Sequence, residues 1–317
     1  MATRLKDEGA SLPSPAPKAA SGFQSWSLFE EPYWLDSVAP DGWEAVEVRE
    51  AGELVGRLPY IVKKKAGLSR LTQPPLTPWL GPWIRPSDGK YNKQLSHQHD
   101  ILAKLLEQLP KTHSKGIYCA PEFTNLMAFH WAGYELGLGY TYRIENLSDI
   151  DAVWSGFRDN IRRECRKAEK KVEVITEPDV GRLMALIEKK FSRQQRSAAN
   201  FAPLIERVED TMSRRGQSRM YFAVDSERRV HAAIYVVFDE RATFFLAGGG
   251  DPELRSSGAH SLLIWRAIQD SAKTSAAFDF EGSMLPPIER FFRAFNARQV
   301  PRYAARKRSY LFSILEA

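Results

Sequence analysis

The stretch from Phe244 to Ser283 constrains the fold of this chain more than any other segment. It reads FFLAGGGDPELRSSGAHSLLIWRAIQDSAKTSAAFDFEGS. The apolar run at its start predicts a short strand, which the glycines stop before Pro252 forbids its continuation. Apolar residues between Leu262 and Ile268 then recur at helical spacing, as in a helix packed on a sheet. A second strand is predicted over 276–280, so the segment indicates an α/β unit.

The loop before this helix has the features of an anion site. Backbone N–H groups at a helix start have no intrahelical acceptor, and the positive end of the helix dipole favours a bound phosphate. Taken alone, however, these residues favour an ordinary strand, loop and helix, with the glycines serving only as turn residues. If the loop holds an anion, the binding residues are Arg255, Ser257, Gly258, Ala259 and His260.

Composition excludes some classes of protein. The 317 residues are 43% hydrophobic and 26% charged, and no run approaches the roughly 18 apolar residues of a membrane helix. Residues 1–22 are rich in Ala, Ser and Pro and predict a disordered leader. Cys119 and Cys165 offer neither a disulfide framework nor a metal site, which favours a reducing cytoplasm. The net charge of +6 favours anionic partners without naming one.

The first half of the chain predicts a hairpin, a structured loop, a helix and two strands. Residues 43–50 and 54–62 carry the hairpin signal, and 92–109 has helical spacing that ends at Pro110. The loop over 71–86 holds five prolines and two tryptophans. Its Trp83 is a candidate wall for a substrate, or else an indole that staples the loop to its domain. Short strands are predicted at 116–120 and 140–144.

The second half begins with the strongest helical period in the chain. Residues 150–168 place apolar side chains on one face and predict a single helix with a basic opposite face. Arg162, Arg163 and Arg166 on that face are either solvated or contact phosphate or RNA. Further elements are predicted at 172–176, 180–191, 203–215, 220–224 and 231–238. We therefore expect two domains, over 23–146 and 147–317.

Three ordered runs resemble one family. FRDNIRRECRKAEKKVEV, GAHSLLIWRAIQDSA and FDFEGSMLPPIERFFRAFNA are similar to the FemAB-like branch of the GNAT acyltransferases, also called BioF2-like acetyltransferases. The RSSGAH loop partly matches the loop with which GNAT enzymes hold the pyrophosphate of coenzyme A. The resemblance implies an α/β (α+β) fold of two GNAT-like domains, each a mixed, mostly antiparallel sheet flanked by helices.

One departure from the family bears on the donor. Members that use aminoacyl-tRNA carry a lysine after the first phenylalanine of a short motif, and the run FFRAFN has Phe292 at that position and Asn296 in place of a glycine. Arg290 or Arg293 is the nearest substitute cation. This favours acetyl-CoA or another acyl-CoA as the donor, with aminoacyl-tRNA as the alternative, and tRNA as a possible partner.

Acyl transfer to an amine needs a base and an acid. Glu281 is the leading candidate base, since a carboxylate that is partly desolvated at a strand end has a raised pKa. Asp279 lies beside it, and these two carboxylates either serve the chemistry or cap a helix and pair with arginines. Tyr303 and Tyr310 are candidates to protonate the leaving group.

The sequence thus predicts a cytoplasmic N-acyltransferase that acts on an amine of a small molecule or peptide, without a metal and without a membrane span. A non-catalytic module that binds RNA or an acidic partner is the rival hypothesis. The sequence specifies neither the acceptor nor an oligomeric state.

Overall fold

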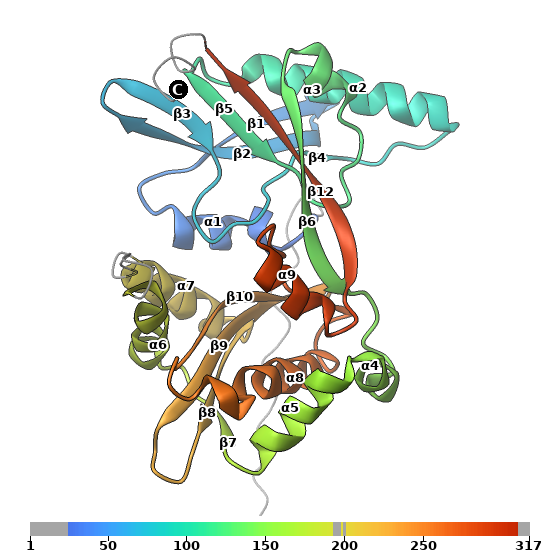
Figure 1. Cartoon of the computed structure of the whole chain (residues 1–317). Helices are drawn as coiled ribbons and strands as arrows, with labels where there is room; N and C mark the ends of the chain where they lie inside the picture. Colours follow the sequence, from blue (N-terminus) through green and yellow to red (C-terminus); the bar gives the residue numbers. More distant parts are fainter. Residues whose placement is uncertain (1–24, 193–197, 199–200, 310–317) are drawn as a thin grey trace, which may run out of the picture.

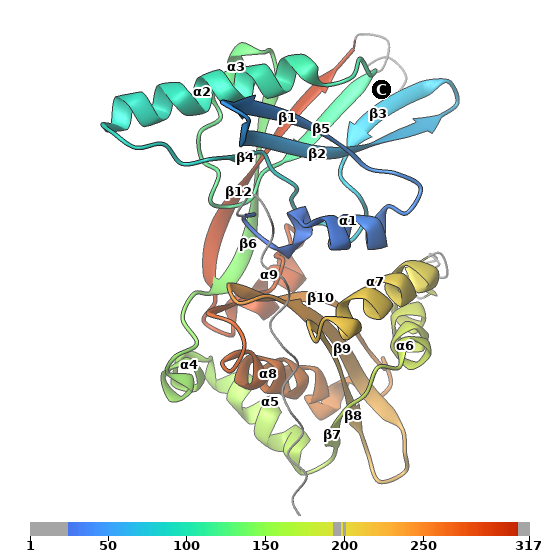
Figure 2. The same ribbon diagram turned by 180° about the vertical axis from the view of Figure 1, so that it is seen from behind.

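The computed structural model describes residues 25–192, 198 and 201–309. The predicted leader over 1–22 and Tyr310 lie outside the described residues. Two lobes, each with its own helices, are joined by two long strands that run side by side between them (Figure 1). The view from behind shows the helix α1 of the upper lobe facing α7 of the lower lobe (Figure 2).

The upper lobe contains most of the first half of the chain. Its elements are η1 (Leu28–Glu30), α1 (Pro32–Val38), β1 (Glu44–Glu50), β2 (Glu53–Lys65), β3 (Leu68–Thr72), β4 (Trp83–Ile84), α2 (Tyr91–Gln108), β5 (Ser114–Tyr118), α3 (Met127–Trp131) and β6 (Glu135–Ile144). The hairpin, the long helix and the strands predicted from the sequence are all present within a few residues of their expected bounds.

The lower lobe follows. Its elements are α4 (Ile150–Gly156), α5 (Asp159–Glu169), β7 (Glu173–Thr176), α6 (Val180–Ser192), α7 (Ala202–Arg214), β8 (Ser218–Val224), β9 (Val230–Phe238), β10 (Ala242–Gly250), η3 (Arg255–Ser257), α8 (Ala259–Ser271), β11 (Ala277–Asp279), α9 (Pro286–Arg293) and β12 (Arg298–Arg308). From α5 to β11 the order of helices and strands is the expected one, while the division into α4 and α5 and the strand β12 were not expected.

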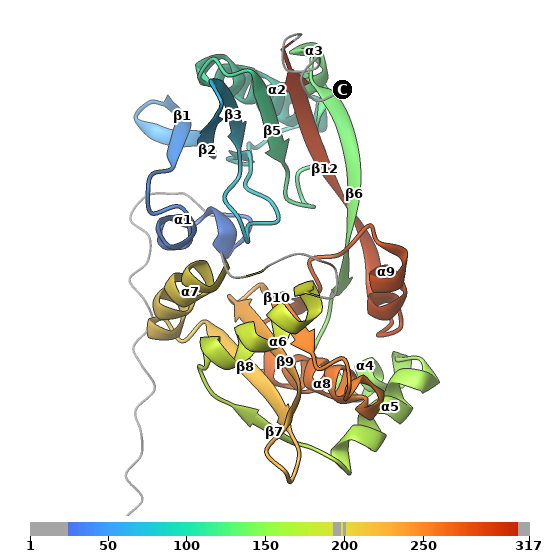
Figure 3. The ribbon, with the colours of Figure 1, turned by 60° about the vertical axis from the view of Figure 1, so that its left-hand side comes forward.

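The strands form one sheet in the order β1-β2-β3-β5-β12-β6-β11-β10-β9-β8-β7, with β4 paired to β2. The lobes share one order: three antiparallel strands (β1–β3 and β8–β10), a helix, a parallel strand, a helix and a last strand. In addition, β4 pairs antiparallel with β2 in the upper lobe and β7 pairs antiparallel with β8 in the lower lobe. The parallel pairs are β3 with β5 and β10 with β11. The last strands are exchanged, since β12 pairs with β5 of the upper lobe and β6 pairs with β11 of the lower lobe. The side view shows both strands crossing between the lobes (Figure 3).

This exchange bears on the two predicted domains. The boundary at 146/147 falls in the connection after β6, but β12 returns from the second half to complete the sheet of the first half. The mixed, mostly antiparallel architecture agrees with the predicted fold class.

Pro301, which has no N–H to donate, lies on β12 opposite Tyr140, before the pairing with β5 begins at Ala304. The sequence analysis predicted no strand here.

Two predictions about secondary structure were wrong. The single helix expected over 150–168 is two helices, because Phe157 and Arg158 are extended, and the N–H of Arg158 donates to the carbonyl of Ala294 at 2.9 Å. The glycines expected to stop the strand after Leu246 instead belong to β10. At Gly249 an added Cβ would lie 3.1 Å from the backbone of Leu186, so glycine lets α6 approach the strand.

Helices cover both faces of the lower sheet. Phe244, Leu246 and Ala277 face α1, α6 and α7 within one hydrophobic cluster. Phe278 and Phe280 belong to a second cluster with α5, α8 and α9. We refer to these two sides as the α6 face and the α8 face. No helix among the described residues is long and apolar enough to cross a membrane.

Candidate functional site

The predicted phosphate loop lines a cavity of about 440 Å³, here called the loop cavity, on the α8 face. Its walls come from the glycines of β10, from η3 and the start of α8, and from α9. All five residues predicted to bind a donor line it: Arg255, Ser257, Gly258, Ala259 and His260. The ring of His260 lies between Phe245 and Phe291, with centroid distances of 6.0 and 5.6 Å.

Gly258 fixes how the loop enters α8. Its φ of 82° is in the left-handed region, and an added Cβ would lie 2.5 Å from the carbonyl oxygen of Glu164 in α5. The hydroxyl of Ser257 accepts a hydrogen bond from the N–H of Ala259 at 3.3 Å, and the hydroxyl of Ser261 donates to Glu164 at 2.5 Å. The absence of a side chain at Gly258 therefore allows the start of α8 to sit against the backbone of α5.

His231 also lines the loop cavity, and the sequence analysis did not single it out. Its side chain is 7% exposed, and Nε2 lies 3.0 Å from Oδ2 of Asp225. The other ring nitrogen, Nδ1, has no hydrogen-bond partner among the described residues. The hydrogen bond to His231, followed by those from Arg229, lowers the pKa of Asp225. The sequence did contain a signal for this pair, because an aspartate and a histidine stand six residues apart across a predicted hairpin.

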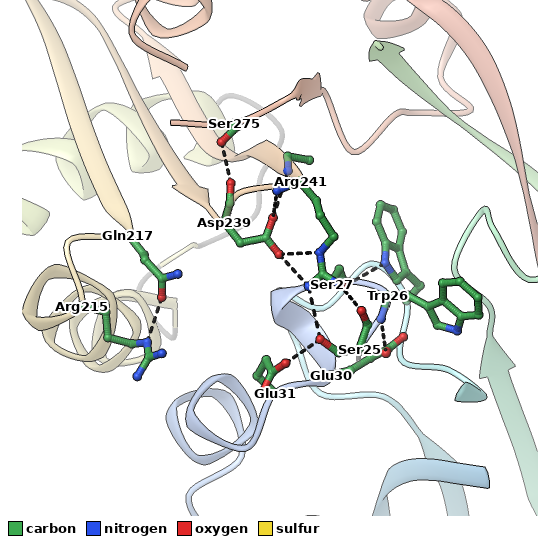
Figure 4. A network of polar contacts seen from close by, with 12 residues as sticks. Ser25, Trp26, Ser27, Glu30, Glu31, Arg215, Gln217, Asp239, Arg241 and Ser275 are labelled. Carbon is green, nitrogen blue, oxygen red and sulfur yellow. Dashed lines mark hydrogen bonds and ion pairs between the residues drawn. The ribbon is translucent and has the colours of Figure 1, made fainter. Parts of the chain in front are cut away.

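A second cavity, of about 580 Å³, lies on the α6 face between the lobes and is here called the inter-lobe cavity. Three indoles and four charged side chains line it: Trp26, Trp79, Trp83, Arg85, Glu122, Arg143 and Arg241. Trp83 was a candidate either to line a substrate site or to anchor its loop. It lines this cavity, and its side chain is also almost fully buried. Arg241 pairs with Asp239 and donates to the carbonyl of Ser25, which joins the β9–β10 turn to the upper lobe (Figure 4).

The two cavities lie on opposite faces of β10 at consecutive residues. Phe244 lines the inter-lobe cavity and Phe245 lines the loop cavity. The parallel pairing of β10 with β11 ends at the same point, with Phe244 opposite Asp279. Beyond it β10 continues beside β9, whereas the chain after Asp279 separates from β10 and stays beside β6, where the N–H of Phe280 donates to the carbonyl of Tyr142 at 2.9 Å. The two cavities therefore flank the place where the sheet divides.

Asp279 is fully buried at this division. Oδ1 accepts hydrogen bonds from Thr141 Oγ1 and from the N–H of Glu281 at 2.8 Å, and Oδ2 accepts from Arg143 Nε at 2.9 Å. Burial raises the pKa of Asp279, while Arg143 and the hydrogen bonds oppose the rise. These partners make Asp279 a support for the turn that carries Glu281.

Glu281 has a strained backbone and an unpaired carboxylate oxygen. Its φ of 56° is left-handed, and the next residue, Gly282, has a φ of 68° and no room for a Cβ against Tyr140. Its Oε1 is buried without a hydrogen-bond partner among the described residues. Burial, and then the charge of Asp279, raise its pKa well above the usual value, while Arg302 lowers it. Glu281 is a lining residue of neither cavity.

The other predicted site residues are not brought to these cavities. Tyr303 lies on β12 opposite Leu138, and strand alternation places it on the face away from Arg302. Arg293 pairs with Glu289 at 2.7 Å. The remaining four are on helix surfaces: Arg162, which pairs with Asp159, and Arg163, Arg166 and Arg290, which are exposed.

Glu30 is a buried carboxyl group beside the inter-lobe cavity that the sequence analysis missed. It is 1% exposed, and Oε2 accepts a hydrogen bond from the N–H of Trp26 at 2.9 Å (Figure 4). Burial raises its pKa to about 8, against the opposing effects of the Trp26 N–H, Arg241 and Arg57. No periodicity in the sequence distinguishes it from the neighbouring Glu31. The described residues contain no group of three or more potential metal ligands of the His, Cys, Asp and Glu types.

Comparisons with known proteins agree with this architecture. The family described as an acetyltransferase (GNAT) domain matches residues 155–306. The solved structure of FemX is 14% identical, covers 87% of this chain and 91% of its own, and superimposes with a TM-score of 0.61. A tandem GNAT protein from the clavulanic acid biosynthesis pathway is 11% identical over 84% of this chain and 83% of its own, with a TM-score of 0.50.

A third structure is the C-terminal domain of a putative lysylphosphatidylglycerol synthetase from Agrobacterium fabrum. It is 9% identical over 86% of this chain and 87% of its own, with a TM-score of 0.51. At these identities the likeness concerns the fold alone. No curated protein sequence matches the chain.

Proposed function

Because this chain is a GNAT-superfamily protein with a FemAB-like tandem fold, we propose that it transfers an acyl group from acyl-CoA to an amine of a small molecule or peptide. The observation that carries the proposal is the pair of cavities on opposite faces of β10, where the sheet divides beside Glu281. A donor on one face and an acceptor on the other meet at such a division.

The donor occupies the loop cavity in this proposal. Its phosphates lie at the start of α8, where Arg255 adds a positive charge and the first N–H groups supply donors. His231 lines the same cavity and contributes Nδ1, with its ring oriented by Asp225 through Nε2. The acyl thioester then extends past Phe245 toward the gap between β10 and the chain after Asp279.

The acceptor occupies the inter-lobe cavity. Its indoles offer faces for an amine-bearing substrate, and Glu122 presents a half-exposed carboxylate at 2.8 Å from Arg143. Amine nitrogen attacks the thioester carbonyl carbon, the C–S bond breaks, and the proton lost by nitrogen passes to Glu281 by way of a water molecule, since this residue lines neither cavity. The thiolate leaves and takes a proton from solvent. Desolvation of Glu281 suits this role, because a raised pKa makes its carboxylate a stronger base.

Asp279 acts in this scheme as a positioning residue. It holds the Glu281 N–H at 2.8 Å and so keeps that residue in its left-handed conformation. We place the enzyme in the cytoplasm, because both cysteines are buried free thiols whose pKa is raised by burial.

An aminoacyl-tRNA donor is the second candidate. The observation in its favour is the exposed basic face of α5, which is next to the loop because Lys167 Nζ donates to the carbonyl of Ser256 at 2.6 Å. A module that binds RNA without catalysis would use the same face.

Calorimetric titration of the full chain with acetyl-CoA tests the choice of donor, alongside filter binding of charged tRNA at several salt concentrations. We expect saturable acetyl-CoA binding that is lost in Arg255→Glu. Retention of tRNA that weakens steeply with salt, together with no acetyl-CoA binding, would replace the first donor by the second. Incubation with amine libraries and a mass search for an added acetyl group then separates an enzyme from a binding module.

A further inference from the structure

The upper lobe contains a third cavity, of about 640 Å³, here called the lysine cavity. It lies between α2, α3 and the adjoining ends of β5 and β12, and none of its lining residues lines the loop cavity or the inter-lobe cavity. All of its lining residues lie outside the family match over residues 155–306. Nothing in the proposed acyl transfer uses it.

Two lysines face each other at the inner end of this cavity. Lys115 and Lys307 are directly opposite in the β5–β12 ladder, so their side chains project from the same face of the sheet. Partial burial, and then the charge of Lys307, lower the pKa of Lys115. Like charges in this arrangement oppose folding, and a bound anion would remove the repulsion.

Their hydrogen-bond partners are uncharged. Lys115 Nζ donates to the carbonyl of Pro110 and, at 3.3 Å, to the hydroxyl of Thr112. Lys307 Nζ donates to the carbonyl of Ala132 at 2.7 Å and lies 5.5 Å from the ring centroid of Tyr134. Within the described part of the chain, neither ammonium group has a carboxylate within 4.0 Å. Each ammonium also keeps donor capacity, since it has three N–H groups.

Part of the wall is apolar and contains an indole that contacts a histidine ring on one side. Trp131 is 63% exposed, and its ring centroid lies 4.8 Å from that of His99 in an edge contact. His99 is in turn fixed by a hydrogen bond of 3.0 Å between Nε2 and Oδ1 of Asn125. Leu106 and Ala128 line the same wall. A flat apolar group can therefore lie against a pre-positioned aromatic side chain.

Charge on the rim favours an anion. Four basic residues line the cavity, namely Lys111, Lys115, Lys307 and Arg308, against the two acidic residues Asp100 and Glu107, which come from α2. The lysines of β5 and β12 lie at the sheet side, so the positive potential is concentrated where the strands end.

We propose that the lysine cavity binds a small organic anion, with a carboxylate or phosphate held between Lys115 and Lys307 and a flat apolar body against Trp131. The ligand is distinct from the acyl donor and the acceptor, and the site is separate from both of their cavities.

Calorimetric titration of the full chain with three naphthalene probes tests this proposal: 2-naphthoate, 2-naphthyl phosphate and the uncharged 2-naphthylmethanol. We expect the better of the two anions to bind at least about tenfold more tightly than the alcohol, because charge-assisted hydrogen bonds replace weak neutral ones. The two anionic probes distinguish a carboxylate ligand from a phosphate ligand.

Three variants locate the binding. Lys307→Gln should weaken binding of the preferred anion by about tenfold or more, and Trp131→Ala should weaken binding of the anions and of the alcohol. Lys65→Gln, which removes an exposed lysine at the tip of the β2–β3 hairpin, is the matched control and should bind as the unmodified chain does. Equal affinity for anion and alcohol, or equal binding by Lys307→Gln and Lys65→Gln, would overturn the proposal.

Discussion

Arg143 Nε lies 2.9 Å from Asp279 Oδ2, and this ion pair joins β6 to β11. β6 is the last strand of the first lobe, yet it completes the sheet of the second lobe. The same guanidinium reaches Glu122 through Nη1 at 2.8 Å. One arginine therefore connects the exchanged strand, the wall of the inter-lobe cavity and the support of Glu281.

Removing this arginine should destabilise the protein strongly. Arg143→Met leaves Asp279 as an uncompensated buried charge, for which we expect a loss of roughly 3–5 kcal/mol in the free energy of unfolding. Urea denaturation measures this loss in the free energy of unfolding. Arg49→Met removes an arginine from the exposed pair with Glu47 and should cost no more than about 1 kcal/mol. Equal losses in the two variants would show that the buried ion pair contributes no more to the free energy of unfolding than the exposed pair does.

Glu281→Gln tests the base. The substitution keeps the size of the side chain but removes the proton acceptor, so acyl transfer should fall by about a hundredfold or more while donor affinity is unchanged. Because burial raises the pKa of Glu281, the carboxylate form becomes populated only as pH rises through that raised value. Transfer by the unmodified enzyme should therefore increase with pH, and the residual rate of the variant should lack this rise. Glu135→Gln, on an exposed part of β6, is the control.

Glu30 predicts a pH dependence of stability. Its folded-state pKa of about 8 exceeds the ordinary 4.5, so the folded protein binds more protons than the unfolded chain between these values. The contribution of Glu30 to the free energy of unfolding therefore falls as pH rises from about 5 to 8, by roughly 5 kcal/mol at most.

Asp279 and Glu281 also have raised pKa values, so the comparison with Glu30→Gln isolates this residue. The variant should be relatively more stable at pH 8 than at pH 5, as measured by urea denaturation at both values. A constant difference between the two proteins would contradict the assignment.

Gly258→Ala tests the contact between the loop and α5. The new Cβ would lie 2.5 Å from the carbonyl oxygen of Glu164, in addition to the strain of a left-handed φ of 82°. Gly52 has a φ of 83° but no atom within 4 Å of an added Cβ, so Gly52→Ala measures the strain alone, about 1–2 kcal/mol. We expect Gly258→Ala to cost clearly more and also to weaken binding of acetyl-CoA. Similar unfolding free energies for both variants would mean that α5 shifts to accommodate the new Cβ without further loss of stability.

His231→Gln should weaken donor binding by about tenfold without a comparable change in the rate at saturating donor, because His231 lines the loop cavity and Glu281 does not. Steady-state kinetics separates the two parameters. His130→Gln, which removes an exposed histidine of α3, should change neither. A fall in the saturated rate alone would assign His231 to the chemistry.

Much of the fold could be predicted from local patterns. The helix α8 has a continuous apolar face, and β8 and β9 are apolar runs separated by a polar turn, so their own sequences specify them. The loop from Arg255 to His260 could be placed at a helix start for the same reason. β12 escaped prediction, because its basic and alternating residues acquire a strand conformation only between β5 and β6.

The sequence by itself determined the order of most strands and helices, the loop before α8 and the presence of carboxylates at the end of β11. Tertiary structure alone decided that β6 and β12 exchange lobes, that Glu281 adopts a left-handed turn, and that His231 meets Asp225 beside the loop. Hydrophobic periodicity reports only which side of an element is buried. Which distant strand or side chain covers it depends on pairings between residues more than a hundred positions apart, such as Arg143 with Asp279.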